Sequence, residues 1–124
     1  MADKSKILAI DDDPVVLKLL ASILNPVYEL QIAKSAKEAL KLMAQQKPDL
    51  ILLDIGIPII SGFEFLHMIR RNPESKDIPV IIVSGFIETE FIIHAENEGI
   101  SGMVGKPIQK DDLLSKIEQA LNSH

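Results

Sequence analysis

Five short apolar runs, rich in β-branched residues, alternate along this chain with segments of helical periodicity. Such runs are typical of buried strands, and strands that alternate with helices form parallel sheets with right-handed crossovers. The run at 49–55 is almost wholly apolar and indicates a central strand, whereas 27–32 is more polar and indicates a strand near an edge. The predicted strands cover residues 6–10, 27–32, 49–55, 78–85 and 101–105.

The intervening segments carry helix signals. Pro14 suits the first turn of a helix, because the N–H that proline lacks would be unpaired there. Ser35 and Glu38 form a capping box for a second helix. The predicted helices run from Pro14 to Leu24, from Ser35 to about Gln45, from Gly62 to about Arg71, from about Glu88 to Asn97, and onward from an N-cap at Asp111 or Asp112. We therefore expect an α/β protein with a (βα)5, flavodoxin-like, doubly wound parallel sheet of strand order 2-1-3-4-5 in a three-layer sandwich.

Length and charge exclude several classes of function. The 124 residues are the usual size of one compact domain, so we expect a single domain over 1–124. The net charge of −5 disfavours general binding to nucleic acid or to an anionic membrane. No apolar stretch approaches the roughly 18 residues of a membrane span, and the start is polar, which favours a cytoplasmic protein. Because cysteine is absent, thiolate metal sites are excluded.

Polar residues stand where four of the predicted strands end. Asp11 and Asp12 follow the first strand and Asp54 the third, Ser84 lies near the end of the fourth, and Lys106 follows the fifth. The order 2-1-3-4-5 brings these strands side by side, and ligands of such sheets bind beyond the carboxyl ends of the strands. The sequence therefore predicts one site with an acid pair, a third acid, a hydroxyl and a cation.

This set of residues favours magnesium-dependent phosphoryl transfer. Mg²⁺ prefers oxygen ligands and takes one or two carboxylates together with water or a phosphate oxygen. Asp54 is the candidate nucleophile, because attack of a carboxylate on phosphorus yields an acyl phosphate. The Lys106 ammonium supplies charge and Ser84 a hydrogen bond to a phosphoryl oxygen. Asp13 is predicted either to cap the following helix or to support the site.

The stretches "DDDP", "PDLILLDIGIP", "SGFEFL", "IPVIIVSG" and "GKPI" resemble those of response-regulator receiver domains over essentially the whole chain. The resemblance implies that a sensor histidine kinase or a histidine phosphotransfer protein phosphorylates Asp54. It also implies Mg²⁺ held by Asp12 directly, by Asp11 often through water, by Asp54 and by the backbone carbonyl of Gly56. Ser84 and Lys106 match the family's hydroxyl and lysine, and the Lys106–Pro107 bond is often cis in relatives.

The chain departs from the family pattern at Met103, where relatives usually carry Tyr or Phe. In relatives that ring moves inward when the hydroxyl residue shifts, so Ser84 and Met103 are the expected switch residues. Ser61 stands where Asp commonly precedes the loop glycine. The resemblance also implies an output surface on the fourth helix, fifth strand and fifth helix, where an unknown effector or a second copy would bind.

Two apolar stretches raise the question of docking. Ile57, Ile59 and Ile60 lie in the loop after Asp54, where they either pack under the next helix or receive the phosphodonor beside the first helix. The run 91–93 covers more than one helical face, so we expect some apolar surface there. His67 and His94 sit within helices and are not expected to carry phosphate.

Two other functions compete with this interpretation. "DDDPVV" also fits the Asp-x-Asp-x-Val pattern of haloacid-dehalogenase phosphatases, with Asp11 as nucleophile and Asp13 as acid/base. However, the Asp111–Asp112 pair opens a helix where that superfamily needs a strand end, and Asp54 would have no role. A binding module that keeps the fold without phosphorylation is the other alternative. We expect no turnover enzyme, but at most self-phosphorylation from small donors and self-dephosphorylation.

Overall fold

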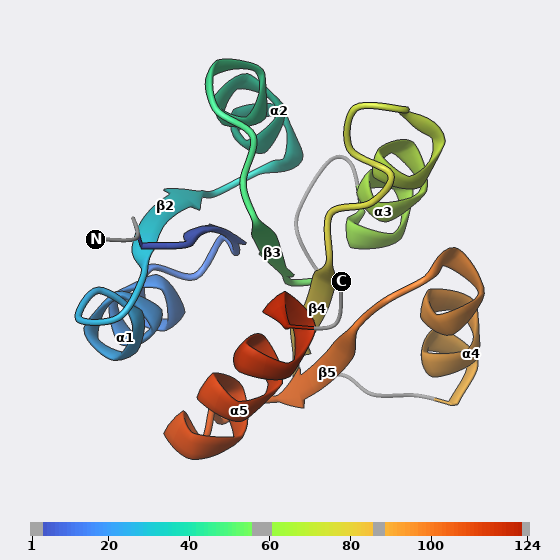
Figure 1. The fold of residues 1–124 in the computed structure, drawn as a ribbon. Coiled ribbons are helices and arrows are strands. Elements are labelled where there is room, and N and C mark those ends of the chain that lie inside the picture. Colours follow the sequence, from blue (N-terminus) through green and yellow to red (C-terminus); the bar gives the residue numbers. More distant parts are fainter. Residues whose placement is uncertain (1–3, 56–60, 86–88, 123–124) are drawn as a thin grey trace.

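One five-stranded parallel sheet with the order β2-β1-β3-β4-β5 forms the centre of the molecule (Figure 1). The structure is a computed structural model that describes residues 4–55, 61–85 and 89–122. The predicted fold class and strand order are confirmed. The elements in chain order are β1 (Lys6–Ile10), α1 (Pro14–Leu24), β2 (Glu29–Ala33), α2 (Ala36–Gln45), β3 (Leu50–Leu53), α3 (Gly62–Arg71), β4 (Val80–Ser84), α4 (Thr89–Glu98), β5 (Gly102–Gly105) and α5 (Lys110–Leu121).

Helices cover both faces of the sheet. Figure 1 shows α1 and α5 on one face and α2, α3 and α4 on the other. Each face has its own apolar cluster, because successive side chains of a strand point in opposite directions. In β3, Leu50 and Leu52 join the cluster under α1 and α5, while Ile51 and Leu53 join the cluster under α2, α3 and α4. All four residues of β3 are buried, which confirms the predicted central strand.

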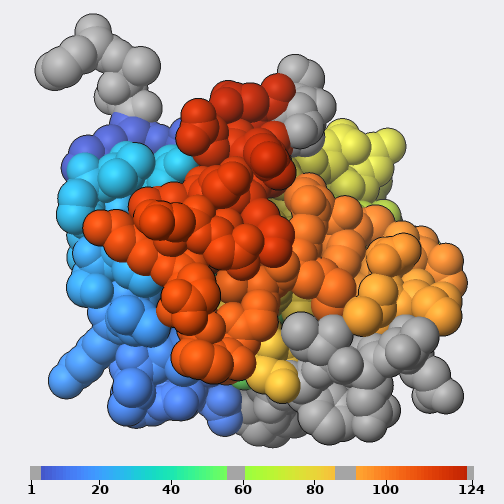
Figure 2. All heavy atoms as spheres, turned by 90° about the horizontal axis from the view of Figure 1, so that it is seen from below, coloured from blue at the N-terminus to red at the C-terminus, as the bar shows by residue number. Residues whose placement is uncertain are grey.

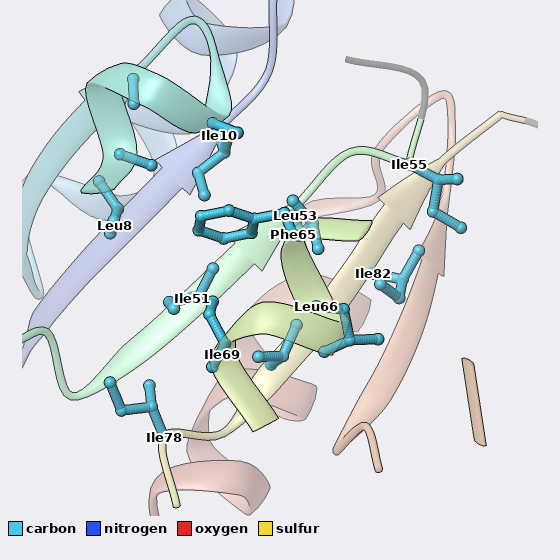
Figure 3. Packing of buried hydrophobic residues seen from close by; sticks show 14 of the residues in the cluster. Leu8, Ile10, Ile51, Leu53, Ile55, Phe65, Leu66, Ile69, Ile78 and Ile82 are labelled. Atoms are coloured by element: carbon cyan, nitrogen blue, oxygen red, sulfur yellow. The ribbon is translucent and has the colours of Figure 1, made fainter. Parts of the chain in front are cut away.

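The cluster under α3 sets the position of that helix. Figure 3 shows Phe65, Leu66 and Ile69 of α3 among the side chains of the sheet. Phe65 and Leu66 have no exposed surface, and Ile69 is only 2% exposed. Since burial of a large apolar side chain contributes about 1.5–3 kcal/mol, these three side chains fix α3 against the sheet. The start of α3 is thereby held next to the end of β3.

Three helices begin at side-chain caps that the sequence patterns favour. Asp13 accepts a hydrogen bond from the amide of Val15, Ser35 from that of Glu38, and Ser61 from that of Glu64. Such caps satisfy amides that have no partner within the helix. The predicted N-cap at Ser35, which is one half of the predicted capping box, and the capping role of Asp13 are confirmed.

Several predicted boundaries are wrong by one or two residues, and one predicted cap is wrong. The second strand begins at Glu29, two residues later than predicted, because the amides of Val27 and Tyr28 both bond to the carbonyl of Leu24 in a turn that closes α1. Neither Asp111 nor Asp112 caps α5, since Gln109 is the N-cap and makes no side-chain cap bond.

The acids Asp111 and Asp112 lie instead in the first turn of α5. There their charge favours the positive end of the helix dipole without a direct cap. Among the residues that the structure describes, no helix combines the length and the apolar character needed to cross a membrane.

Candidate functional site

The carboxyl ends of four strands bring the predicted site residues to one edge of the sheet. Asp11 follows β1 and Asp54 follows β3, and these strands are neighbours with Ile10 opposite Leu53. Ser84 ends β4, where it lies opposite Gly105, the residue before Lys106. Because parallel strands end at the same edge of the sheet, these residues lie in one row although they are far apart in the sequence.

The three acids form a cluster. Asp11, Asp12 and Asp54 each offer a carboxylate oxygen, and these oxygens lie within 4.8 Å of one another. Asp11 is 2% exposed and Asp54 9%, whereas Asp12 is exposed. An all-oxygen donor set that is open to solvent on one side fits Mg²⁺, which takes few carboxylates and keeps several waters. Gly56, the other predicted ligand, lies outside the described residues.

Both oxygens of Asp11 have protein partners. Oδ1 accepts a hydrogen bond of 2.9 Å from the amide of Asp13, and Oδ2 accepts one of 2.9 Å from the ammonium of Lys106. The amide of Asp11 donates to the carbonyl of Ala33 at the end of β2. Asp11 is thus held from three sides, while Asp12 presents the exposed carboxylate of the cluster.

Lys106 lies between two of the acids. Its Nζ is 2.9 Å from Oδ2 of Asp11 and 3.4 Å from Oδ2 of Asp54. Burial alone lowers the pKa of Lys106, but the hydrogen bond to Asp11 and the charges of Asp54 and Asp11 outweigh it and raise the pKa above its ordinary value. The ammonium therefore stays charged near neutral pH and offsets the repulsion among the acids. The Lys106–Pro107 bond is cis, as the resemblance implied.

Gly62 is a supporting position that the sequence interpretation missed. A Cβ at Gly62 would lie 2.5 Å from the Cα of Ile55 and 2.8 Å from the carbonyl oxygen of Asp54. The amide of Gly62 also donates to the carbonyl of Ile55. The N-terminus of α3 thus packs directly on the backbone of Asp54, an approach that only glycine permits. The signal was the "SG" pair at the start of a predicted helix.

Lys116 is a second residue that sequence analysis did not single out. Its Nζ donates to the carbonyl of Met103 at 2.7 Å and contacts Asp112 at 3.1 Å. Met103 is partly buried, and it packs against the cluster under α2, α3 and α4. Lys116 therefore ties the backbone of β5 to α5 at the position where the chain departs from the family pattern. Helical spacing alone gave no signal for this contact.

The two histidines lie away from the acid cluster. His67 of α3 contacts Glu98 of α4 at 2.5 Å, and the His94 ring of α4 meets Phe63 edge to face with centroids 4.9 Å apart. Ile93 of α4 is 55% exposed, which confirms apolar surface in that helix. The isoleucines at 57, 59 and 60 and the histidine at 124 lie outside the described residues.

Comparison with known proteins decides the family. A sequence model described as "response regulator receiver domain" matches residues 7–118. The chain belongs to the response regulator receiver family. A CheY-like receiver domain protein from Methanospirillum hungatei has the same fold, with a TM-score of 0.90, 30% identity, and coverage of 98% of this chain and 96% of that one.

Curated relatives place the receiver in chains of different lengths. KdpE, a transcriptional regulatory protein of Staphylococcus aureus, is 35% identical over 98% of this chain but 53% of its own length. PilH of Pseudomonas aeruginosa is 29% identical over 94% of this chain and 98% of its own. This chain spans only 26% of a Vibrio cholerae protein that is named as a cyclic di-GMP phosphodiesterase.

Receiver membership gives the chain a phosphoacceptor role in two-component signalling. Receiver domains exchange phosphoryl groups with histidine kinases or phosphotransfer proteins, and they typically bind Mg²⁺ at an acidic cluster such as the one seen here. The haloacid-dehalogenase alternative is not favoured, because Asp111 and Asp112 lie in α5 and end no strand. The alternative of a silent binding module is not favoured either.

Proposed function

We propose that Asp54 is the phosphoacceptor of this receiver and that Asp11, Asp12, Lys106 and Ser84 assist the transfer. The position of Asp54 carries the proposal, because its carboxylate belongs to the acid cluster and also contacts the Lys106 ammonium at 3.4 Å. No other described carboxylate except that of Asp11 contacts this lysine. Asp54 follows the third strand, the position that the family resemblance assigns to the phosphoacceptor, whereas Asp11 follows the first strand.

The transfer forms one bond and breaks one bond. A carboxylate oxygen of Asp54 attacks the phosphorus of a phosphohistidine, the P–N bond breaks, and the imidazole nitrogen leaves and takes up a proton from water. Asp11, Asp12, Asp54 and the carbonyl of Gly56 would hold Mg²⁺, which supplies positive charge for the phosphoryl oxygens. Lys106 adds a second positive charge and Ser84 a hydroxyl donor.

Acetyl phosphate labelling tests the assignment. Wild-type protein with radiolabelled acetyl phosphate and Mg²⁺ is expected to gain label, and Asp54→Asn is expected to lose it. Asp13→Asn is the matched control, because it removes a neighbouring charge but keeps a side chain that caps α1 well. Loss of label in Asp11→Asn with retention in Asp54→Asn would instead assign the nucleophile to Asp11.

We propose α1 as the docking surface of the phosphodonor. Val15 is 73% exposed and Leu19 41% exposed, and they lie one turn apart on the helix that begins beside the acid cluster. Large apolar side chains at i and i+4 form the kind of stripe that a partner helix buries. A sensor histidine kinase or a phosphotransfer protein would lie across this stripe with its phosphohistidine above Asp54.

We propose the α4–β5–α5 face as the output surface. Figure 2 shows residues of α5 and of the β5–α4 region side by side on one face of the molecule. Ser84 and Met103 would relay the phosphorylated state to it, since Met103 packs against the apolar cluster under α2, α3 and α4 and its carbonyl is held by Lys116 of α5. Phosphorylation would favour one of two conformations of this face. Sedimentation of free and phosphorylated protein tests for a dimer there; monomers in both states would remove the dimer.

The remaining assignments follow from this proposal. Residues 1–124 would act as one receiver domain that accepts phosphate rather than turning over a substrate, apart from self-phosphorylation by small donors and self-dephosphorylation. A cytoplasmic location, expected from the polar start of the sequence, is part of the same proposal.

A further inference from the structure

An apolar groove lies between α2 and α3, away from every residue that was given a role in phosphorylation, metal binding or output above. Its volume is about 480 Å³, and its lining includes Leu40, Met43, Met68, Ile69 and Ile78. Figure 1 shows α2 and α3 as neighbours on the same face of the sheet. The groove lies near the C-terminal ends of both helices and before the start of β4, and hence at the edge of the sheet opposite the acid cluster.

The groove has a fixed floor and adaptable walls. Ile69 and Ile78 are 2% and 3% exposed and belong to the core cluster that Figure 3 shows. Leu40 and Met68 rise from the two helices and remain 37% and 43% exposed. Met is unbranched and flexible, so such a wall can adjust to an apolar side chain that enters. A groove between two helices with exposed apolar walls suits the insertion of side chains from a helical segment.

The segment 34–47, which contains α2, is basic although the chain as a whole carries a net charge of −5. Residues 34–47 hold four lysines and a single carboxylate. These lysines are exposed, and none of them forms an ion pair with another residue that the structure describes; they are Lys34, Lys37, Lys41 and Lys47.

One of these lysines, Lys47, lines the groove. Lys37 and Lys41 of α2 each lie three residues before a lining residue, Leu40 and Ala44, so they are neighbours of the groove on the helix surface. Glu74 is the one carboxylate among the described lining residues. Positive charge on the rim of an apolar groove complements a partner that carries both carboxylates and apolar side chains.

We propose that the α2–α3 groove is a docking site for an acidic amphipathic helix of a protein partner. Its leucine-like side chains enter between Leu40 and Met68, and its carboxylates pair with the lysines of α2. An apolar floor disfavours a nucleic acid or a lipid surface as the occupant, since each would use the lysines alone. Docking at this edge leaves Asp54 accessible, so the partner binds the phosphorylated and the free receiver.

Peptide titration followed by two-dimensional amide NMR tests this proposal. The probe is a synthetic peptide of about four helical turns, with leucine at helical spacing and glutamate on the other positions. A twin carries lysine in place of glutamate, and a second twin carries alanine in place of leucine. We expect only the glutamate–leucine peptide to bind, with a dissociation constant of about 100 μM or tighter. The shifted amides should cluster in α2, α3 and the segment before β4.

Substitutions that reverse the charge of the α2 lysines or shorten a side chain in the groove wall test whether the peptide binds in the groove. We expect Lys37→Glu combined with Lys41→Glu to weaken binding about tenfold or more, and Met68→Ser to weaken it about as much. Lys18→Glu combined with Lys110→Glu is the matched control, because it changes the net charge equally on exposed residues outside α2. Thermal unfolding verifies that each variant folds.

Several results would overturn the docking site. These are equal binding of the glutamate and lysine peptides, shifts that fall outside α2 and α3, and no binding of the glutamate–leucine peptide at millimolar concentration. Binding to phosphatidylserine vesicles that depends on the lysines but not on Met68 would indicate a simple charged surface. Because acetyl phosphate labelling of Asp54 is independent of all these readouts, failure here is distinguishable from failure of the proposed function.

Discussion

Replacement of Lys106 with methionine removes one charge from the acid cluster and keeps an unbranched stem. In the wild type, the ammonium donates a 2.9 Å hydrogen bond to Asp11 and contacts Asp54 at 3.4 Å. The two carboxylates are 2% and 9% exposed, so solvent can replace the lost contacts only in part. We expect the variant to fold but to be less stable when no Mg²⁺ is present.

The size of the loss follows from the two contacts. A hydrogen bond that involves charged groups contributes about 1.5–3 kcal/mol. The second contact is longer, and the Lys106 side chain is 24% exposed, so screening reduces its contribution. We expect a loss of about 2 kcal/mol, which for a domain of this size lowers the melting temperature by about 8 °C.

Thermal unfolding at neutral pH in the presence of a chelator measures this loss. Lys110→Met is the matched control, because Lys110 is exposed on the first turn of α5. Millimolar Mg²⁺ should stabilise the Lys106 variant more than the wild type, since it restores positive charge to the cluster. If the Lys106 and Lys110 variants had the same melting temperature and the same response to Mg²⁺, the electrostatic account of the cluster would be refuted.

Three further predictions follow from the site. Gly62→Ala should cost about 2 kcal/mol in urea unfolding and slow acetyl phosphate labelling, because its Cβ would meet the backbone of Asp54 and Ile55; an unchanged stability would contradict the packing. The pKa of Lys106 is raised, so its stabilisation is complete below the unfolded value of about 10.4 and is lost as pH rises through the higher folded value. From neutral pH upward, the difference in unfolding free energy between wild type and Lys106→Met should therefore stay constant until that alkaline range and shrink there. A difference that vanished near neutral pH would disprove this linkage. Val15→Glu combined with Leu19→Glu should slow phosphotransfer from a histidine kinase but leave acetyl phosphate labelling unchanged. An equal loss of phosphorylation with both donors would exclude α1 as the docking surface.

The sheet and the row of strand ends were predictable from local patterns. The apolar run at 49–55 could be covered on both faces only in the middle of a sheet, and strand order then placed Asp11, Asp54 and Lys106 together. Their approach to within hydrogen-bond distance required no long-range information beyond that order. The proline at position 14 and the cap at Ser35 fixed two helix starts in the same way.

Contacts between distant segments were not predictable. Arg70 donates hydrogen bonds to the carbonyls of Gly99, Lys76 and Ile78, and nothing in its local sequence distinguishes it from Arg71. The contact of Lys116 with Met103 likewise depends on how α5 lies across β5. The cap of α5 was misassigned because acidic residues are favoured both at the N-cap and in the first turn of a helix, so the sequence alone does not distinguish the two positions.

Chemical mapping of the phosphorylated residue tests the central claim most directly. Borohydride reduction of the acetyl phosphate-treated protein converts an aspartyl phosphate to homoserine, and mass spectrometry of the peptides then locates it. We predict conversion at Asp54 and at no other aspartate. Conversion at Asp11 or Asp12 with Asp54 unchanged would contradict the account.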